Sequence, residues 1–388
     1  MAMSRRETSS AARLVSIEDA RRRARRRVPL PVFDVADGAA EAEVTARRNL
    51  AAFADVRWYH RAATAAGAPD TGTTLLGRRV AFPLVTAPCG LAGAFHPAAE
   101  PAVARAAARA GVPAAISTCS SASLEEVGAR GGDGGKWFQL YFLGGRDGAE
   151  SLIDRAAGAG YEALVVTVDT PVSGHRERDG AHGVSLPMDL SPANLARLAP
   201  VVARRPGWLW RLARDRHSIE MGNAGAAGDI ASIFAEPPTW ADLGWIRERW
   251  NGPLVVKGLM TPADARRAVD AGADAVVVSN HGGRQLDGLP ASLEALPAVV
   301  EAVGDRAEVL LDGGVRRGSD IAKALALGAR AVLAGRAHLY GLAAAGEPGV
   351  DRVLELLAGE LRRTMTLLGC ASVADLGPHL LDPSGEGR

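Results

Sequence analysis

The sequence repeats one pattern eight times: a short apolar run suited to a β-strand, then a loop, then, where the pattern is clearest, an Ala-rich helix. The apolar runs lie at 80–88, 112–118, 136–142, 163–169, 253–258, 274–280, 307–314 and 330–336. Continuously apolar strands that alternate with helices are typical of a parallel sheet buried on both faces. Eight strand–helix units predict an α/β fold, a single (β/α)8 TIM barrel rather than an open sheet.

The remaining segments divide the chain of 388 residues into an arm, one large domain and a tail. Residues 1–30 form a basic N-terminal arm, in which "RRRARRR" at 21–27 contains six arginines. We interpret these arginines as a solvated helix face, with contact to nucleic acid or an anionic membrane as the alternative. The barrel domain is expected over 31–382, and residues 383–388 form the tail.

The connection 170–252 is too long for a simple loop, and we interpret it as an insertion on the active-site face. Within it, "RRPGWLWRLARDRH" at 204–217 is expected to dock on its own barrel. An interfacial membrane helix is the alternative for this segment.

Composition excludes several classes of protein. Lys and Arg total 45 and Asp and Glu total 44, so a net charge of +1 gives no global attraction to nucleic acid. Three scattered cysteines are too few for a disulfide framework or a zinc site, and we expect no metal. No apolar run reaches the roughly 18 residues that span a bilayer, and the N-terminus lacks the apolar core of a secretory signal. These features predict a cytoplasmic protein.

Polar side chains or glycines follow every one of the eight predicted strands. In a TIM barrel the catalytic residues lie at these carboxyl ends, so the eight groups are expected to meet in one site. They are Pro88-Cys89-Gly90, Ser117, Gln139 with Tyr141, Thr167 with Asp169, Lys257, Ser279 with His281 and Arg284, Asp312-Gly313-Gly314 with Arg316, and Gly335-Arg336.

The last two strand ends, "DGGVRRG" and "AGRA", predict a phosphate site. Glycine lets backbone N–H groups approach a phosphate closely, and arginine adds paired charge-assisted hydrogen bonds. Lys257 is interpreted as a fixed cation beside a cofactor that gains negative charge, such as a reduced flavin; the alternative is an ammonium group that reaches solvent. Neutral hydrogen bonds to the edge of the flavin ring are then expected from Ser117, Gln139, Thr167 and Ser279.

The stretch "SNHGGRQLDG" at 279–288 places a histidine and an arginine directly after a strand. A histidine with a pKa near about 6.5 suits proton abstraction, which makes His281 the candidate base. Arg284 suits capture of a carboxylate through two hydrogen bonds, and Arg176 is a second candidate clamp. Asp169 is expected to orient His281 and to stabilise its charged form.

These stretches, with "LDGGVRRGSDIAKALALGA", "WFQLY" and "TVDTP", resemble the signatures of the FMN-dependent 2-hydroxy-acid oxidases and dehydrogenases, a family that includes glycolate oxidase, lactate dehydrogenase and mandelate dehydrogenase. The resemblance runs from about residue 16 to residue 382 and is greatest to the lactate and mandelate branch. It implies FMN held by the backbone of Pro88, Cys89 and Gly90, and by Ser117, Gln139, Thr167, Lys257, Ser279, Asp312, Gly313, Gly314, Arg316, Gly335 and Arg336. It also implies His281 as base, Asp169 as its partner, and Tyr141, Arg176 and Arg284 as substrate ligands.

The implied reaction converts a 2-hydroxy acid into a 2-oxo acid, with the hydrogen passing to the flavin. Dioxygen, a quinone and a cytochrome all remain open as the electron acceptor. The resemblance also implies a homo-oligomer, a tetramer.

Two departures from the family pattern concern the pocket. Val35 stands where the family usually has a tyrosine that contacts the substrate carboxylate. Cys119 stands where glycolate oxidase has an aromatic residue and mandelate-type members have a small one. Together they predict a larger or less polar pocket and a bulky or atypical substrate.

Two alternative functions follow. One is an FMN oxidase of the same fold acting on an amine or a hydroxylated centre of a natural-product or peptide intermediate. The other is an FMN-binding protein without turnover. The presence of His281, Arg284 and Lys257 favours the 2-hydroxy-acid reaction.

Overall fold

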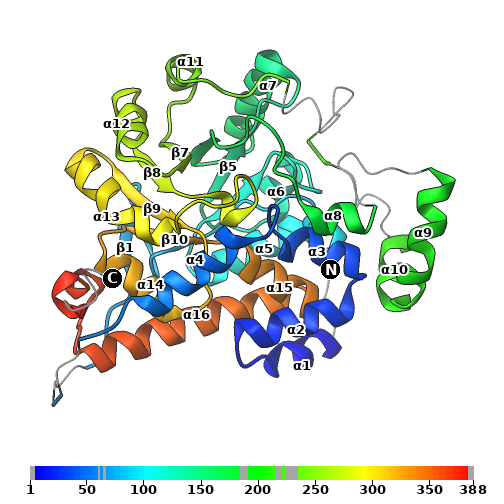
Figure 1. Ribbon diagram of the computed structural model, residues 1–388, viewed down its shortest axis with the longest axis horizontal. Helices are drawn as coiled ribbons and strands as arrows, with labels where there is room; N and C mark the ends of the chain where they lie inside the picture. Colours follow the sequence, from blue (N-terminus) through cyan, green and yellow to red (C-terminus); the bar gives the residue numbers. More distant parts are fainter. Residues whose placement is uncertain are drawn as a thin grey trace.

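The computed structural model describes residues 5–59, 62–63, 67–183, 191–214, 221–223 and 235–382. Eight parallel strands close into a barrel in the order β10-β3-β4-β5-β6-β7-β8-β9, which confirms the predicted (β/α)8 fold (Figure 1). The strands are β3 (Leu84–Thr86), β4 (Ala114–Ser117), β5 (Lys136–Leu140), β6 (Ala163–Thr167), β7 (Leu254–Leu259), β8 (Ala275–Val278), β9 (Glu308–Asp312) and β10 (Ala331–Ala334).

Two apolar layers hold the barrel together. Alternate strand residues such as Val165 and Val255 fill its interior, while their neighbours Leu164 and Leu254 point outward to the helices. Full burial of each such side chain stabilises the folded protein by about 1.5–3 kcal/mol relative to an exposed side chain. The surrounding helices are α5 (Ala99–Arg109), α6 (Leu124–Arg130), α7 (Gly145–Gly158), α11 (Asp242–Arg249), α12 (Pro262–Asp270), α13 (Ser292–Val303), α14 (Gly318–Ala326), α15 (Arg336–Ala345) and α16 (Glu347–Leu368).

The first predicted strand, 80–88, is divided between two elements. Val80 ends β2 (Arg78–Val80), which pairs antiparallel with β1 (Thr73–Leu75), and β3 begins only at Leu84. Pro83 has no N–H to donate to a strand ladder, which explains the interruption. Leu75 and Val80 of this hairpin are buried with the barrel interior.

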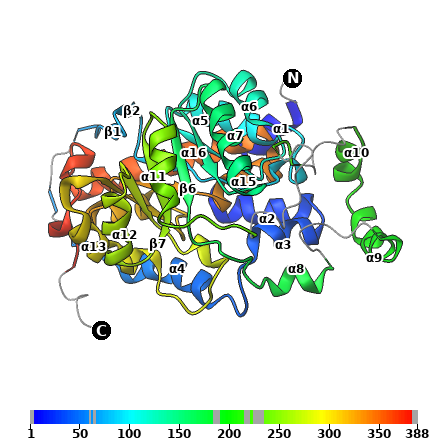
Figure 2. The same ribbon diagram turned by 90° about the horizontal axis from the view of Figure 1, so that it is seen from above.

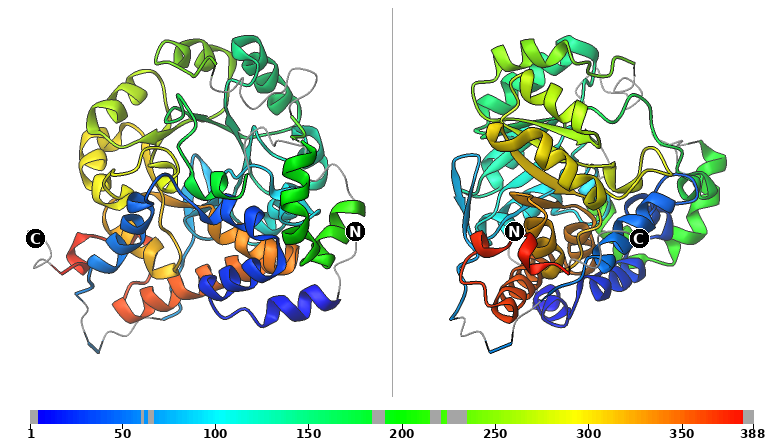
Figure 3. Two further views of the ribbon diagram at one scale, coloured as in Figure 1. Left: turned by 45° about the vertical axis from the view of Figure 1, so that its right-hand side comes forward. Right: turned by 60° about the vertical axis from the view of Figure 1, so that its left-hand side comes forward.

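The N-terminal arm is docked on the barrel. Helices α1 (Arg5–Ala12) and α2 (Ile17–Arg27) lie beside α15 and α16, as the blue and orange ribbons show in Figure 3. Ile17, Ala20 and Ala24 form the buried face of α2, and four of the six arginines at 21–27 extend outward from it. The chain then passes through α3 (Leu30–Asp37) and α4 (Val44–Asp55).

The structure describes four helices within residues 170–252: α8 (Glu177–Ala181), α9 (Pro192–Ala203), α10 (Pro206–Arg214) and α11, the last of which is one of the helices around the barrel. Helices α9 and α10 project at the edge of the molecule (Figures 1 and 2). The indole of Trp208 is buried and donates from Nε1 to the carbonyl oxygen of Ala94 over 2.7 Å, so this tryptophan docks on the barrel as predicted. Residues 215–217 of that predicted segment lie outside the described residues. None of the helices that the structure describes is both long and apolar enough to cross a membrane.

Candidate active site

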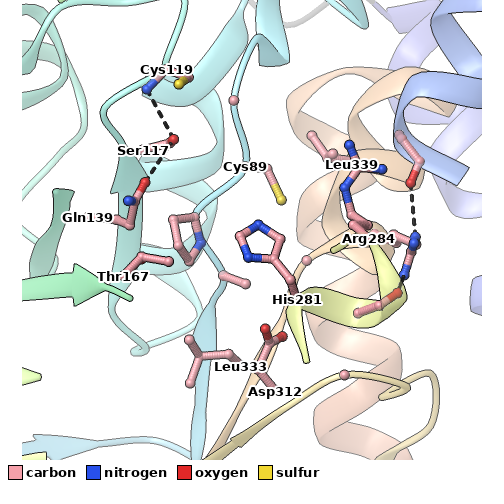
Figure 4. Close-up of a pocket in the computed structure, with 18 of the residues that line it drawn as sticks. Cys89, Ser117, Cys119, Gln139, Thr167, His281, Arg284, Asp312, Leu333 and Leu339 are labelled. Atoms are coloured by element: carbon pink, nitrogen blue, oxygen red, sulfur yellow. Dashed lines mark hydrogen bonds between the residues drawn. The ribbon is translucent and has the colours of Figure 1, made fainter. Parts of the chain in front are cut away.

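A cavity opens at the carboxyl end of the barrel, where the strand-end residues were predicted to meet (Figure 4). Asp169 and Ser279 lie behind its wall and hydrogen-bond to residues that line it. The other predicted residues all line the cavity: Pro88, Cys89, Gly90, Ser117, Gln139, Tyr141, Thr167, Arg176, Lys257, His281, Arg284, Asp312, Gly313, Gly314, Arg316, Gly335 and Arg336. Val35 and Cys119, the two departures from the family pattern, line it as well.

His281 and Asp169 form a pair at this cavity. Nδ1 of His281 lies 3.0 Å and 3.2 Å from the two carboxylate oxygens of Asp169. Burial lowers the pKa of His281, although Asp169 opposes that effect. Burial by itself raises the pKa of Asp169, but its interactions with His281, which include a hydrogen bond, and with Lys257 outweigh burial and lower it. The pair is therefore a carboxylate beside an imidazole that is neutral at neutral pH.

The backbone fixes the position of His281. Its φ is 57°, a left-handed conformation that is uncommon for residues other than glycine and costs energy. The Ser279 hydroxyl accepts a hydrogen bond from the His281 N–H over 3.1 Å. Asn280 exchanges side-chain hydrogen bonds with Asn49 of α4, which anchors the turn from the other side. The surroundings thus maintain a strained turn that directs the imidazole into the cavity.

Lys257 is buried, with 3% of its surface exposed, and does not reach solvent. Its Nζ lies 3.0 Å from both the Ser279 Oγ and an Asp312 carboxylate oxygen. Burial lowers the pKa of Lys257, but Asp312 and Asp169 outweigh burial and raise it. The lysine is therefore a fixed cation at the base of the cavity. The Ser279 hydroxyl also donates to Asp312 over 2.8 Å, so it orients this ion pair.

Three arginines, Arg176, Arg284 and Arg336, line the cavity and interact through their charges. Arg284 donates from Nη1 to the carbonyl oxygens of Val35 and Gly38, at 2.7 Å and 3.0 Å. Burial, together with the charges of Arg176 and Arg336, lowers the pKa of Arg284 to about 9. A bound anion relieves this repulsion, so the cavity favours a carboxylate or a phosphate. The last turn of α3 and the glycine that follows it thus complete the site by binding an arginine through their backbone.

Arg336 lines the cavity and also binds backbone carbonyl groups through its guanidinium group. Nε, Nη1 and Nη2 each donate over 2.9 Å to a carbonyl oxygen, those of Ala36, Gly282 and Gly38. Arg336 therefore supplies positive charge to the cavity while its planar group ties the N-terminal segment to the loop after β8.

The lining residues fit an FMN molecule. Gln139 Nε2 and Thr167 Oγ1 are buried polar atoms without a hydrogen-bond partner within the described parts of the chain. Ser117 Oγ donates to Gln139 Oε1 over 3.0 Å, which fixes the amide and leaves its Nε2 to a ligand. Figure 4 shows these three side chains together on one side of the cavity, opposite Arg284. The edge of a flavin ring offers the polar partners that such buried atoms require.

The loop after β9 fits the phosphate group of such a ligand. Gly313 and Gly314 have φ values of 109° and 86°, a region that side-chain-bearing residues rarely adopt. Both glycines and Arg316 line the cavity, as the sequence predicted for a phosphate loop.

Two residues of the site were missed by the sequence reasoning. Gln285 donates from Nε2 to the carbonyl oxygens of Asp169 and Val172 and accepts at Oε1 from the Gly174 N–H, so it holds the segment that leads to Arg176. Thr170 lines the cavity with a buried hydroxyl that has no partner among the described residues. Both lie in stretches already singled out, "SNHGGRQLDG" and "TVDTP", which was the only available signal.

Comparison with known proteins establishes the family. A model of the FMN-dependent dehydrogenases matches residues 24–383. The chain belongs to this family. FMN is therefore its cofactor, in agreement with the fit of the cavity.

Individual relatives cover nearly the whole chain. An L-lactate dehydrogenase of Caulobacter vibrioides is 45% identical over 94% of this chain and 97% of its own length. A pre-mycofactocin synthase of Mycobacterium tuberculosis is 43% identical over 94% of each. A solved structure described as the monotopic membrane protein (S)-mandelate dehydrogenase superposes with a TM-score of 0.89, at 38% identity over 95% of this chain and 99% of that one. A mandelate oxidase with (S)-2-phenylpropionate gives 0.81, at 41% identity over 95% and 98%.

Proposed function

We propose that this protein oxidises a 2-hydroxy acid to a 2-oxo acid with FMN. The observation that carries the proposal is the partly buried His281–Asp169 pair, whose imidazole shares one cavity with the guanidinium groups of Arg176 and Arg284. A base beside two cations suits a substrate that carries a carboxylate next to the carbon that is oxidised. An FMN-binding protein without turnover has no need of that combination.

Arg176 and Arg284 bind the substrate carboxylate in this proposal, and Tyr141 assists them. Burial raises the pKa of the Tyr141 phenol well above its usual value, so the hydroxyl stays protonated and can donate a hydrogen bond to the carboxylate. Arg284 is held by Val35 and Gly38, which fixes its orientation before substrate arrives.

His281 accepts the substrate proton at Nε2. A carboxylate can only accept hydrogen bonds, so Nδ1 carries the hydrogen that points to Asp169 and Nε2 is left with its lone pair. The imidazolium formed is stabilised by the negative charge of Asp169. FMN, when bound, accepts the two electrons that leave the substrate. Lys257 keeps a positive charge at the base of the cavity throughout.

We further propose that the substrate is bulky, because Val35 and Cys119 both line the cavity. A valine in place of a tyrosine removes one hydrogen bond to the carboxylate and enlarges the space beside Arg284. An aryl 2-hydroxy acid suits such a pocket. The second candidate is a peptide intermediate, which the relative named pre-mycofactocin synthase brings into consideration. Arg284 favours the 2-hydroxy acid, since it adds a second fixed cation at the site.

Anaerobic mixing with a graded set of substrates tests the proposal. Acid should release FMN from the purified protein, and mass spectrometry should identify it. Glycolate, L-lactate and (S)-mandelate are then added without oxygen, and flavin absorbance is followed. The proposal expects bleaching, an equivalent amount of 2-oxo acid, and the fastest reduction with the aryl acid. If no 2-hydroxy acid reduces the flavin but a peptide does, the second candidate replaces the first.

The electron acceptor and the oligomeric state stay predictions. Oxygen uptake, reduction of a quinone analogue and reduction of cytochrome c, measured in parallel with one reducing substrate, distinguish the three acceptors. Light scattering of the purified protein tests the tetramer.

A further inference from the structure

Arg176 owes its place in the cavity to the helix that follows it. It is the N-cap residue of α8, a helix of five residues, none of which is buried. So short a helix is not stable by itself in water, and its position depends on tertiary contacts. The Nε of Arg176 is buried without a hydrogen-bond partner among the described residues, and its ion pair with Asp179 is long, at 3.9 Å. The group that anchors α8 therefore also positions the Arg176 guanidinium.

Arg178 is the main anchor of α8. The helix packs against α3, and Figures 1 and 2 show the two side by side. Nη1 of Arg178 donates to Asp37 over 3.0 Å and lies 3.6 Å from Asp34, while Nη2 donates to Glu43. His182, at the other end of α8, adds a second contact, with its Nε2 2.7 Å from Asp34. One guanidinium group thus joins α8 to three carboxylates of the N-terminal segment 34–43.

The carboxylates that Arg178 meets are fixed by other parts of the fold. Asp37 also accepts hydrogen bonds from Arg21 of α2 and from the Tyr340 hydroxyl of α15, the latter over 2.7 Å. Arg178 is 40% exposed, but each of its three partner side chains is at most 17% exposed. An exposed pair contributes little singly, whereas several charges that act on one group form a network. Arg178 therefore docks on a rigid acidic surface.

The second proposed substrate ligand depends on the same segment. Arg284 donates to the carbonyl oxygens of Val35 and Gly38, within residues 34–43. The contacts of Arg178 therefore connect Arg176 and Arg284 to one stretch of backbone.

We propose that Arg178 is a positioning residue for carboxylate binding, which sets the spacing of the Arg176 and Arg284 guanidinium groups by joining α8 to the N-terminal segment. This inference rests on the proposed function, in which those two arginines bind the substrate carboxylate. Arg178 does not line the cavity, so it acts through Arg176 and not on the substrate.

Binding of phenylacetate by the FMN-loaded protein tests this role without turnover. Phenylacetate has the carboxylate of an aryl 2-hydroxy acid but no hydroxyl group to oxidise. Its dissociation constant is measured from the change in flavin absorbance. Arg178→Gln should raise that constant about tenfold, the lower end of the cost of losing one charge-assisted hydrogen bond. With (S)-mandelate, KM should rise by a similar factor and kcat should change little, because the lost interaction binds ground state and transition state alike.

Further variants separate positioning from general damage. Glu43→Gln changes the other side of one contact, and the double variant with Arg178→Gln should bind phenylacetate no more weakly than Arg178→Gln alone. Arg178→Lys keeps the charge and should weaken binding by less than about threefold. Arg306→Gln, the control, breaks the pair with Asp270 at the amino end of the barrel and should bind as the unchanged protein does. Circular dichroism and FMN content establish that each variant is folded.

Four results would overturn the proposal. The unchanged protein does not bind phenylacetate; Arg178→Gln binds it no more weakly than Arg306→Gln does; the losses in Arg178→Gln and Glu43→Gln add in the double variant; or Arg178→Gln lowers kcat as much as it raises KM. If phenylacetate binding depends on Arg178 while no 2-hydroxy acid reduces the flavin, the proposed reaction is wrong and the positioning role of Arg178 stands.

Discussion

Replacing Asp169 by asparagine tests the electrostatic half of the proposed base. The amide keeps the size of the side chain and can still accept from Nδ1 of His281, so the change removes mainly the negative charge. After proton transfer the imidazolium and the carboxylate form an ion pair, with 3.0 Å between Nδ1 and the carboxylate oxygen. At an effective dielectric constant of about 20, Coulomb's law gives this pair an attraction of about 5.5 kcal/mol, from 332/(20 × 3.0). That corresponds to about 10⁴-fold in rate. The His281 side chain is 21% exposed, and solvent reduces the effect, so we expect a loss of about 10³-fold.

Anaerobic stopped-flow reduction of the flavin is the assay, because it measures this step apart from reoxidation. Asp169→Asn should retain FMN with an unchanged absorbance spectrum while the limiting rate of reduction falls. Asp147→Asn, an exposed aspartate in the first turn of α7, is the control and should behave as the unchanged protein. A loss of less than about tenfold in Asp169→Asn would refute the reasoning that Asp169 stabilises the imidazolium.

Three further predictions concern pH, specificity and stability. Because burial lowers the pKa of His281 from 6.5, kcat/KM should rise with pH through an apparent pKa below 6.5 and be level at neutral pH; a rise centred above 7 would contradict this assignment. Val35→Tyr should restore a charge-assisted hydrogen bond of about 1.5–3 kcal/mol, or about ten- to a hundredfold in affinity, for lactate or glycolate, and should impair aryl substrates; an equal shift for every acid would show that Val35 does not set specificity. Burial raises the pKa of Asp37, but Arg21, Tyr340 and Arg178 outweigh it and lower the value from 3.8 to about 2. The stability that the charged Asp37 contributes is therefore fully present above pH 3.8 and is lost as the pH falls toward 2. The urea midpoints of Asp37→Asn and of the unchanged protein should converge over that pH range. A difference that stays constant with pH would rule out the ion pairs of Asp37 as the source of this stability.

The barrel could be predicted because its signal is local. Each strand is an unbroken apolar run, and the helices after them end at glycines such as Gly272 and Gly328, so the alternation is readable without knowledge of any contact. The exception, the run at 80–88, shows the limit. Apolar residues on both sides of Pro83 look like one strand, but they belong to a hairpin and to the barrel.

The candidate site could be predicted only where side chains carry its chemistry. His281, Arg284 and Lys257 stand at strand ends and were recognised there. The carbonyl groups of Val35, Ala36 and Gly38 that hold Arg284 and Arg336 could not be recognised, because every residue has a carbonyl. The ion pair between Lys257 and Asp312 also depends on how two strands meet, which spacing along the chain does not express.

The insertion illustrates a third case. The tryptophans of 204–217 marked the segment as able to dock either on the barrel or on a membrane. The structure assigns Trp208 to the barrel and leaves Trp210 on the outer face. Two residues apart on one helix, they lie about 200° apart around its axis, so the docking of Trp208 leaves Trp210 exposed.

Flavin reduction in His281→Ala tests the central claim most directly. The variant and the unchanged protein, both loaded with FMN, are mixed without oxygen with the best 2-hydroxy acid of the graded set. The account predicts that His281→Ala folds, retains FMN and is reduced about 10²–10⁴-fold more slowly, as expected when a general base is removed. Near-normal reduction of the flavin in His281→Ala would contradict the assignment of His281 as the base, and with it the proposed reaction.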